Sequence, residues 1–415
     1  MAYRTLEKTL HADRSSERFE HHDELFRQRF TSESTFRTGI LLDTGELFLA
    51  VPRELSVVNE QVLRRERRVS ALWRGLPTVA LCPFIRSLIM DEVVYSNEIE
   101  GVHSTRREIE LALDQAQRDS SVLKNVATKE HAPFIEFAKL YLGLTENPKP
   151  PQTLQDIRNI YDAVVSDALD SRDRLGDSLF RTGQVVVERA DGRVLHTGVA
   201  PEQKIEDMLT QWLELSERDD MPETYRAILC HFLFGYIHPF YDGNGRTGRY
   251  LLSLQLSEPL SQPTVLSLSR TIAENKAAYY RAFDTTERPL NRAEGTHFVL
   301  TMLGLVAEAQ EDLIANLEEK RTLLQLIEDR LKACEGRVSQ RALDVLYYAA
   351  QMEVFDAFQE TRMSEVVTWL GVSVPTVRRA FDELVSEGLL VRVSKRPPVF
   401  RLTEQSRGLL GLTSR

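Results

Sequence analysis

The fold of this 415-residue chain is decided by one stretch, His238-Pro239-Phe240-Tyr241-Asp242-Gly243-Asn244-Gly245-Arg246-Thr247-Gly248-Arg249. The residues before it, from Glu223 to Ile237, are nearly all apolar beyond Arg226, which predicts a buried helix. Pro239 ends that helix, because the residue before a proline is disfavoured in the α-helical region. We expect the next helix to begin at about Arg246.

The same stretch combines groups that handle phosphate. Gly243 and Gly245 can take a positive φ, and Asn244 tolerates it better than most residues. Such a turn can point several backbone N–H groups at an anion, and the following helix adds its free N-terminal amides. Arg246 and Arg249 lie three residues apart, on one face of that helix. With one imidazole and one carboxylate in the same stretch, the sequence predicts a polyphosphate site with a base beside it. The alternative is a tight turn between helices with solvated charges.

Composition bounds the class of protein. The chain is 42% hydrophobic and 27% charged, which is ordinary for a globular protein of two or three domains. Its net charge of −10 argues against nonspecific binding of nucleic acid by the whole protein surface, although this net charge is compatible with a local basic patch. Cys82, Cys230 and Cys334 are few and widely spaced, so we expect reduced thiols and no metal spacing. The polar N-terminus and the lack of a membrane-length apolar run predict a cytoplasmic protein.

A second informative stretch ends at Gly101. Residues 84–99 follow a helical pattern, Gly101 is a typical residue just past a helix end, and Thr105-Arg106-Arg107-Glu108 is a capping box for the next helix. Glu100 is therefore expected at a helix carboxyl terminus, where the helix dipole disfavours a carboxylate. It would gain most from a cation supplied by another part of the fold, and Ser96 lies within reach on the same face. The alternative is a solvent-exposed glutamate in a corner between helices.

The hydrophobic period changes between residues 184 and 195. Val185-Val186-Val187, Asp191-Gly192 and Val194-Leu195 predict a β-hairpin in a mostly helical chain. A lone hairpin is marginal, so it is either a decorative edge or a clamp that presents strand edges to an extended peptide. Residues 269–283 predict a helix with Tyr279 and Tyr280. Paired tyrosines are more often core than ligand platform, yet they are the best candidates here for stacking on a base.

The two ends of the chain differ in what they indicate. Residues 1–50 are mixed and polar, with a short hairpin expected at 39–49 and no assigned chemistry. Near the C-terminus, a short helix, a turn at Gly371, a helix capped by Ser373 and two strands around residues 394–398 predict a winged helix-turn-helix. From Met363 onward there are eight Lys and Arg against five Asp and Glu, a net +3. DNA binding and protein interaction are the two expectations for this domain.

The central stretch resembles the active-site signature of the Fic (filamentation induced by cAMP) family. The family pattern is His-x-Phe-x-Asp/Glu-Gly-Asn-Gly-Arg-x-x-Arg, and every specified position is met from His238 to Arg249. Ser96-x-x-x-Glu100-Gly101 resembles the inhibitory motif of the subclass that carries it N-terminal to the core. Phe180-Arg181-Thr182-Gly183-Gln184-Val185-Val186-Val187 resembles the start of the family's flap hairpin.

The resemblance extends from the helical segment that ends at Gly101 to about residue 300. It implies a mainly α fold, a Fic-type helical core with a β-hairpin flap, to which the winged helix-turn-helix domain is added. We expect an N-terminal helical region over 1–120, the Fic core over 121–325 and the winged domain over 335–415.

The family resemblance implies a protein adenylyltransferase, which moves AMP from ATP to a Ser, Thr or Tyr hydroxyl of a target protein. His238 would be the general base that takes the hydroxyl proton, and Asp242 would hold Mg²⁺. The backbone from Gly243 through Asn244 to Gly245 would cradle the α- and β-phosphates. Arg246 would grip the β-phosphate and Arg249 the γ-phosphate.

The resemblance also implies regulation and target binding. In the family, a glutamate such as Glu100 pairs with the second motif arginine, here Arg249, and displaces the γ-phosphate. We therefore expect autoinhibition by Glu100, with Ser96 in the same motif. Removal of AMP from the target is a further expectation, because the same glutamate supports it in some relatives. The flap residues, which would align the target segment, include Gly183, Val185 and Val187.

Other activities stay open at this point. A phosphorylating branch of the family carries lysine where this chain has Arg246, so nucleotidyl transfer is favoured here. UMP or phosphocholine donors stay open, because only Tyr279 and Tyr280 indicate an adenine pocket. From a different class, the chain would be chiefly a DNA-binding regulator with a silent Fic module, although the intact motif argues against this. Helical cores of this kind often form homodimers, so a homodimer is a further alternative.

Overall fold

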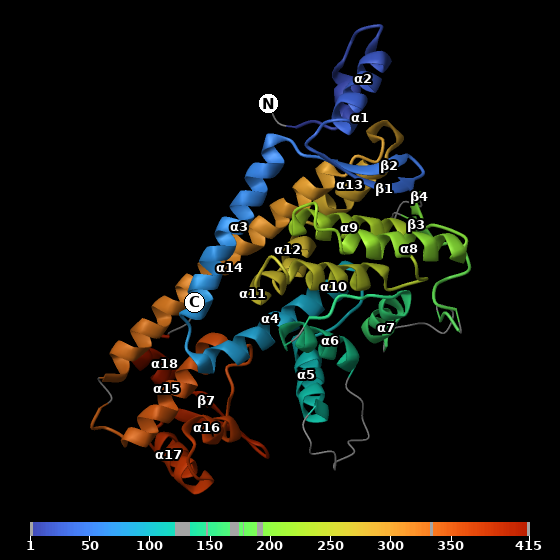
Figure 1. The fold of residues 1–415 in the computed structure, drawn as a ribbon. Helices are drawn as coiled ribbons and strands as arrows, with labels where there is room; N and C mark the ends of the chain where they lie inside the picture. Colours follow the sequence, from blue (N-terminus) through green and yellow to red (C-terminus); the bar gives the residue numbers. More distant parts are fainter. Residues whose placement is uncertain are drawn as a thin grey trace. The chain divides into compact units, whose positions relative to one another are not determined.

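The computed structural model of the chain describes residues 3–120, 133–146, 148–166, 174–176, 178–188, 194–332 and 335–412. Helices make up most of these residues (Figure 1), which confirms the predicted mainly α fold. The chain divides into two compact units, Met1–Arg67 with Ile89–Glu311, and Arg68–Leu88 with Asp312–Arg415. The domain limits expected from the sequence stay a prediction.

Three long helices have residues in both units: α3 (Arg53–Arg74), α4 (Thr78–Ile99) and α14 (Thr296–Leu331). The other elements of the first unit are α1 (Leu6–Ala12), α2 (Arg18–Phe30), β1 (Thr35–Leu42), β2 (Gly45–Ala50), α5 (Arg106–Ser120), α6 (Ile135–Glu146), α7 (Leu154–Val165), β3 (Val186–Glu188), β4 (Val194–Thr197), α8 (Glu202–Ser216), α9 (Glu223–Ile237), α10 (Asn244–Leu256), α11 (Gln262–Val265), α12 (Leu268–Glu274), α13 (Lys276–Glu287) and the 3₁₀ helix η2 (Pro289–Asn291). Within the described residues, no helix is both long and apolar enough to cross a lipid bilayer.

Helix α9 is the centre of the first unit. Twelve of its 15 residues are buried, as expected for a helix that is apolar on every side. It packs against α8 on one side and α10 on another (Figure 1). Helix α10 is buried along most of its length as well. The turn between these two helices is therefore built into the core of the unit, which limits how far its side chains can move.

Both predicted hairpins of the first unit are present. Strands β1 and β2 pair antiparallel around residues 43–44, although β1 begins before the expected position. Strands β3 and β4 also pair antiparallel, with Val187 opposite His196. The predicted turn at Asp191-Gly192 lies outside the described residues, as does Cys334. Helices α1 and α2 lie where the sequence indicated no element.

Two predicted helix limits are wrong. Helix α4 begins at Thr78, six residues before the expected start, with Pro83 inside it. The helix expected over residues 269–283 is divided at Asn275 into α12 and α13. The Asn275 side chain donates to Thr271 O (3.1 Å), which is a local hydrogen bond that competes with helix continuation.

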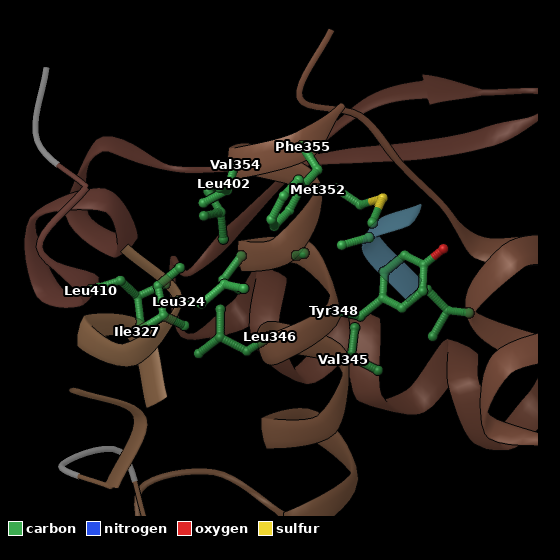
Figure 2. Close-up of a cluster of buried hydrophobic side chains, with 14 of the residues drawn as sticks. Leu324, Ile327, Val345, Leu346, Tyr348, Met352, Val354, Phe355, Leu402 and Leu410 are labelled. Atoms are coloured by element: carbon green, nitrogen blue, oxygen red, sulfur yellow. The ribbon is translucent and has the colours of Figure 1, made fainter. Parts of the chain in front are cut away.

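The second unit has its own hydrophobic core. Its further elements are α15 (Gln340–Phe355), β5 (Thr361–Arg362), α16 (Met363–Leu370), α17 (Val374–Ser386), β6 (Leu390–Lys395), β7 (Pro398–Leu402) and α18 (Glu404–Leu410), and the strands form one sheet in the order β5-β7-β6. Figure 2 shows Leu324 and Ile327 of α14 gathered with Leu346 and Met352 of α15 and with Leu402 of β7. The helices and strands of α16 to β7 lie where the sequence predicts them, and their assignment as a winged helix-turn-helix stays a prediction.

Candidate active site

The turn between α9 and α10 carries a left-handed histidine. Helix α9 ends at His238, whose backbone has φ 50° and ψ 60°, and whose N–H donates to Phe234 O (3.0 Å). The prediction that Pro239 ends the helix is confirmed. Few non-glycine residues take a positive φ, and they persist where surrounding contacts hold them.

Helix α10 begins at Asn244, two residues before the predicted start. Gly243 precedes it with φ +79°, which is the positive φ expected there. Gly245 does not use its capacity for a positive φ, because it lies inside the first turn of the helix. What Gly245 supplies is space, because a Cβ atom there would lie 2.0 Å from Oε1 of Glu100. The glycine thus allows the glutamate to approach the helix start.

The turn is held from inside by two side chains. Phe240 is fully buried and stacks on Tyr161, with ring centroids 3.6 Å apart. The Asn244 side chain accepts from Phe240 N (2.9 Å) and donates to Phe240 O (2.8 Å). The first bond of α10 runs from Thr247 N to Gly243 O (3.0 Å), so the three preceding N–H groups have no intrahelical acceptor. These groups form the amide end of the candidate phosphate cradle.

Arg246 is buried with unused donors. Its side chain is 0% exposed, and one nitrogen, Nη2, lies 3.5 Å from Oδ2 of Asp242. Its Nε and Nη1 atoms have no hydrogen-bond partner among the described residues. Burial lowers the pKa of Arg246, with Asp242 opposing that shift. Since buried donors without partners are costly, this arrangement favours an anion beside the first turn of α10.

Arg249 is paired with Glu100 across the fold. Its Nη1 atom donates to Oε1 of Glu100 at 2.6 Å, and its side chain is 2% exposed against 26% for the glutamate. Ser96 contacts Arg249 here, rather than Glu100: Nε donates to Ser96 Oγ (3.1 Å) and Nη2 to Ser96 O (2.7 Å). Burial disfavours the charge on Arg249, but Glu100 more than compensates, so the pKa of Arg249 is raised. Ser96 of α4 and Glu100, directly after the end of α4, thus both contact Arg249 of α10.

A cavity of about 160 Å³ lies beside these groups. Its walls include His238, Glu100 and Arg249, together with Tyr279 and Tyr280. Burial, and then the charges of nearby groups, lower the pKa of His238 to about 4. The imidazole is therefore neutral near pH 7 and able to accept a proton.

The two tyrosines differ in what they contact. Tyr279 is buried and its hydroxyl lies 2.8 Å from Nε2 of His231, whereas Tyr280 is more than a third exposed. His231 also lines the cavity, where burial lowers its pKa to about 3. Both tyrosines lie at the cavity, and their role as an adenine pocket stays a prediction.

The predicted flap lies against the motif. Gly183 N–H donates to the hydroxyl of Tyr241 (3.0 Å), which is part of the motif. Val185 accepts from Gly198 N (3.0 Å), and the Val187 backbone pairs with His196 on β4. The hairpin segment is therefore attached to the same turn that carries His238. Whether it binds a target segment stays a prediction.

Several residues near His238 or Arg249 were not identified as site residues from the sequence. Arg181 donates to His238 O (2.7 Å), and His196 lies 2.6 Å from Glu287 on the cavity wall.

Glu92 is buried on α4 and accepts from Ser269 N (2.9 Å) and Oγ (2.6 Å). Burial raises the pKa of Glu92 to about 7. The available signal for Glu92 was its helical spacing of four and eight residues from Ser96 and Glu100.

The predicted metal ligand Asp242 is half exposed. No group of three or more His, Cys, Asp and Glu side chains in the described part of the chain is arranged to hold a metal ion. A single accessible carboxylate beside a phosphate cradle fits Mg²⁺ that arrives with phosphate oxygens, since this ion is commonly bound by one or two carboxylates plus substrate phosphates.

Comparisons with known proteins agree with this geometry. A family model described as Fic/DOC family matches residues 151–256, which include the whole turn. Protein adenylyltransferase fic-1 of Caenorhabditis briggsae is 30% identical over 151 residues, which cover 35% of this chain and 27% of that protein. Protein adenylyltransferase Fic of Nematostella vectensis is 27% identical over 188 residues, which cover 44% of this chain and 40% of that protein. The chain thus spans well under half the length of these relatives.

A solved structure shares the fold. The crystal structure of a Fic family protein from Desulfovibrio desulfuricans G20 aligns with a TM-score of 0.50 and 17% sequence identity, and it covers 85% of this chain and 97% of that chain. At this identity the likeness concerns the fold alone.

Proposed function

We propose that this chain, whose residues 151–256 constitute a Fic domain, transfers AMP from ATP to a hydroxyl group of a target protein. The observation that carries the proposal is the pair of buried, unpartnered nitrogens of Arg246 beside the free amides of α10. Asp242, 3.5 Å away, compensates part of the arginine charge but leaves Nε and Nη1 without an acceptor, and a polyphosphate would supply acceptors for both donors. The names of the matched relatives supply the class of reaction.

His238 is the proposed general base. Its ring lies at the cavity and is neutral near pH 7. In the reaction it takes the proton of the target hydroxyl, and the hydroxyl oxygen forms a bond to the α-phosphorus of ATP. The bond from that phosphorus to the bridging oxygen breaks, and pyrophosphate leaves. A neutral imidazole is required for the first step, because an imidazolium has no free lone pair.

The proposed phosphate contacts come from α10 and the turn before it. The N–H groups of Asn244, Gly245 and Arg246 point out of the helix start and would bind phosphate oxygens. The free Nε and Nη1 atoms of Arg246 would add two charged donors, and Arg249 would add its Nη1 group once that group is released from Glu100. Donors fixed in the fold before the reaction stabilise charge that develops during displacement.

Asp242 would hold Mg²⁺ at the edge of the cradle. When bound, the ion neutralises phosphate charge and orients the polyphosphate. The carboxylate is accessible, and the 3.5 Å contact with Arg246 keeps it beside the cradle.

The ion pair of Glu100 with Arg249 supports autoinhibition. While Nη1 of Arg249 donates to Glu100 at 2.6 Å, the carboxylate would compete with a γ-phosphate for this guanidinium group. ATP bound to the resting chain would therefore lack the Arg249 contact that is proposed to hold its γ-phosphate. The same glutamate, close to the cradle, would also be placed to assist hydrolysis of the modified target, in which water forms a bond to the phosphorus, the bond to the target hydroxyl oxygen breaks, and AMP leaves.

Labelling with ATP that carries ³²P at the α-phosphate tests the proposal. The full chain, Mg²⁺ and a cell lysate as target pool are incubated, and protein-bound label is measured. We expect label in the Glu100→Gly chain, and its loss when His238→Ala is added. Retained label in the double variant contradicts the role of His238, and no label with α-labelled ATP, UTP or CTP contradicts nucleotidyl transfer.

A second candidate function is DNA binding by the second unit. In α17, Arg378 and Arg379 are exposed beside the buried Val377, and Lys395 at the end of β6 and Arg396 in the following turn are also exposed. Exposed cations of this kind suit phosphate contacts. A gel shift with genomic DNA fragments tests it: binding that survives His238→Ala and is lost in Arg378→Ala with Arg379→Ala supports DNA binding, and no shift at low salt contradicts it.

A further inference from the structure

Two side chains with N–H donors cap the carboxyl end of helix α9, where His238 lies. Arg181 is buried, and it donates from Nε to His238 O (2.7 Å) and from Nη2 to Ile237 O (3.3 Å). His196 donates from Nε2 to Tyr236 O (2.7 Å). The last carbonyl groups of a helix lack intrahelical partners and carry partial negative charge, so cations are favoured there.

Arg181 also joins this helix end to both sides of the flap hairpin. Its Nη1 atom donates to Gly183 O before β3, and Nη2 donates to Val199 O after β4, each at 2.7 Å. The fit is tight: a Cβ atom on Gly198 would lie 2.4 Å from Nη2 of Arg181 and 3.2 Å from Cβ of His238. One guanidinium group therefore contacts the hairpin and the histidine backbone together.

His196 makes the second link from the hairpin. Its Nε2 atom faces Tyr236 O, and its Nδ1 atom lies 2.6 Å from Oε2 of Glu287. The carbonyl of Tyr236 can only accept, so Nε2 is the donor in that contact. The Glu287 carboxylate contacts the other ring nitrogen and fixes the orientation of the imidazole from the opposite side. The rings of His196 and His238 lie 6.2 Å apart, so the link ends beside the proposed base.

We propose that Arg181 and His196 are positioning residues for the reaction at His238. They hold the left-handed backbone of His238 in place and fix the flap hairpin relative to it. The base and the hairpin edge that would bind the target therefore keep a constant position relative to each other. A left-handed non-glycine residue needs such support, because its conformation is unfavourable by itself. The inference rests on the proposed function of His238 as base, but its structural part can be measured without any transfer activity.

The test compares Arg181→Gln and His196→Gln with a matched control, each in a Glu100→Gly chain. The control is Arg226→Gln, because Arg226 also donates to a backbone carbonyl, Arg218 O, but at the opposite end of α9. Three quantities are measured: kcat with α-labelled ATP, Kd for ATP, and hydrogen exchange of the backbone amides of Val199 and His238. Thermal melts exclude variants that do not fold.

We expect kcat to fall at least about tenfold in both test variants, since a displacement of about 1 Å at a reacting group can cost about 10²-fold. The Kd for ATP should stay within about twofold, because neither side chain belongs to the phosphate cradle. Amide exchange at Val199 and His238 should become faster in the test variants and not in Arg226→Gln.

Three results would overturn the inference: unchanged exchange at these amides, an unchanged kcat, or a kcat that falls equally in Arg226→Gln. If the Glu100→Gly parent transfers no nucleotide, the proposed function fails, and the exchange measurement still decides whether Arg181 and His196 hold the His238 backbone. His196→Gln serves this purpose where Arg181→Gln does not fold.

Discussion

Replacement of Glu100 by glutamine should activate the protein while making it less stable. The substitution keeps the shape and one oxygen of the side chain and removes its charge. Two unit charges 2.6 Å apart attract by about 6 kcal/mol at an effective dielectric constant of about 20. Desolvation of the buried arginine offsets part of this, which leaves a net coupling of about 3 kcal/mol.

This coupling has two measurable consequences. Because the pair must break before Arg249 can contact a γ-phosphate, its loss should raise AMP transfer at subsaturating ATP by about 10²-fold, at about 1.4 kcal/mol per tenfold. Because Arg249 stays buried and loses its charged partner Glu100, Tm should fall by about 5 °C in the absence of nucleotide.

The assay follows label transfer from α-labelled ATP together with thermal melts. Glu98→Gln is the matched control, because Glu98 is exposed on the last turn of α4, two residues before Glu100. A lower Tm without faster transfer would refute the inhibitory role and leave the ion pair as a purely structural contact. Equal activation by Glu98→Gln would refute the assignment to the Arg249 pair.

Three further outcomes are expected. Since the pKa of His238 is lowered to about 4, kcat/KM should stay flat from about pH 8 to about pH 5 and fall only below that; a midpoint near 6.5 contradicts it. The pKa of Glu92 is raised from 4.5 to about 7, so the folded chain binds the proton more tightly and stability is lost as pH rises through that range. The free energy of unfolding of Glu92→Gln, relative to that of the wild type, should therefore increase by up to about 3 kcal/mol between pH 4.5 and pH 8 in urea titrations. A difference between the two proteins that does not change with pH contradicts this prediction. Phe240→Ala should lower the free energy of unfolding by about 3–5 kcal/mol, because the ring is fully buried against Tyr161; a change below about 1 kcal/mol in urea titration argues against that packing.

Most of the local structure of the site was predictable from the sequence. The proline after His238, the glycine at position 243 and the apolar run of α9 act through neighbouring residues, so their effects can be inferred from short stretches. The two helices of the turn and the flap hairpin follow from such rules. The break at Asn275 did not, because a side-chain bond to the backbone competes with a helix that the residue pattern alone favours.

The sequence by itself thus determined which groups meet around the turn: a base, a carboxylate, amide donors and two arginines within twelve residues. Only the tertiary structure decided what each of them faces. Arg249 meets Glu100 from a position 149 residues away, and Arg181 reaches His238 O across 57 residues. Such contacts depend on how α4 and the hairpin pack against α9 and α10. Periodicity shows which face of a helix is buried, but not which distant side chain lies against it.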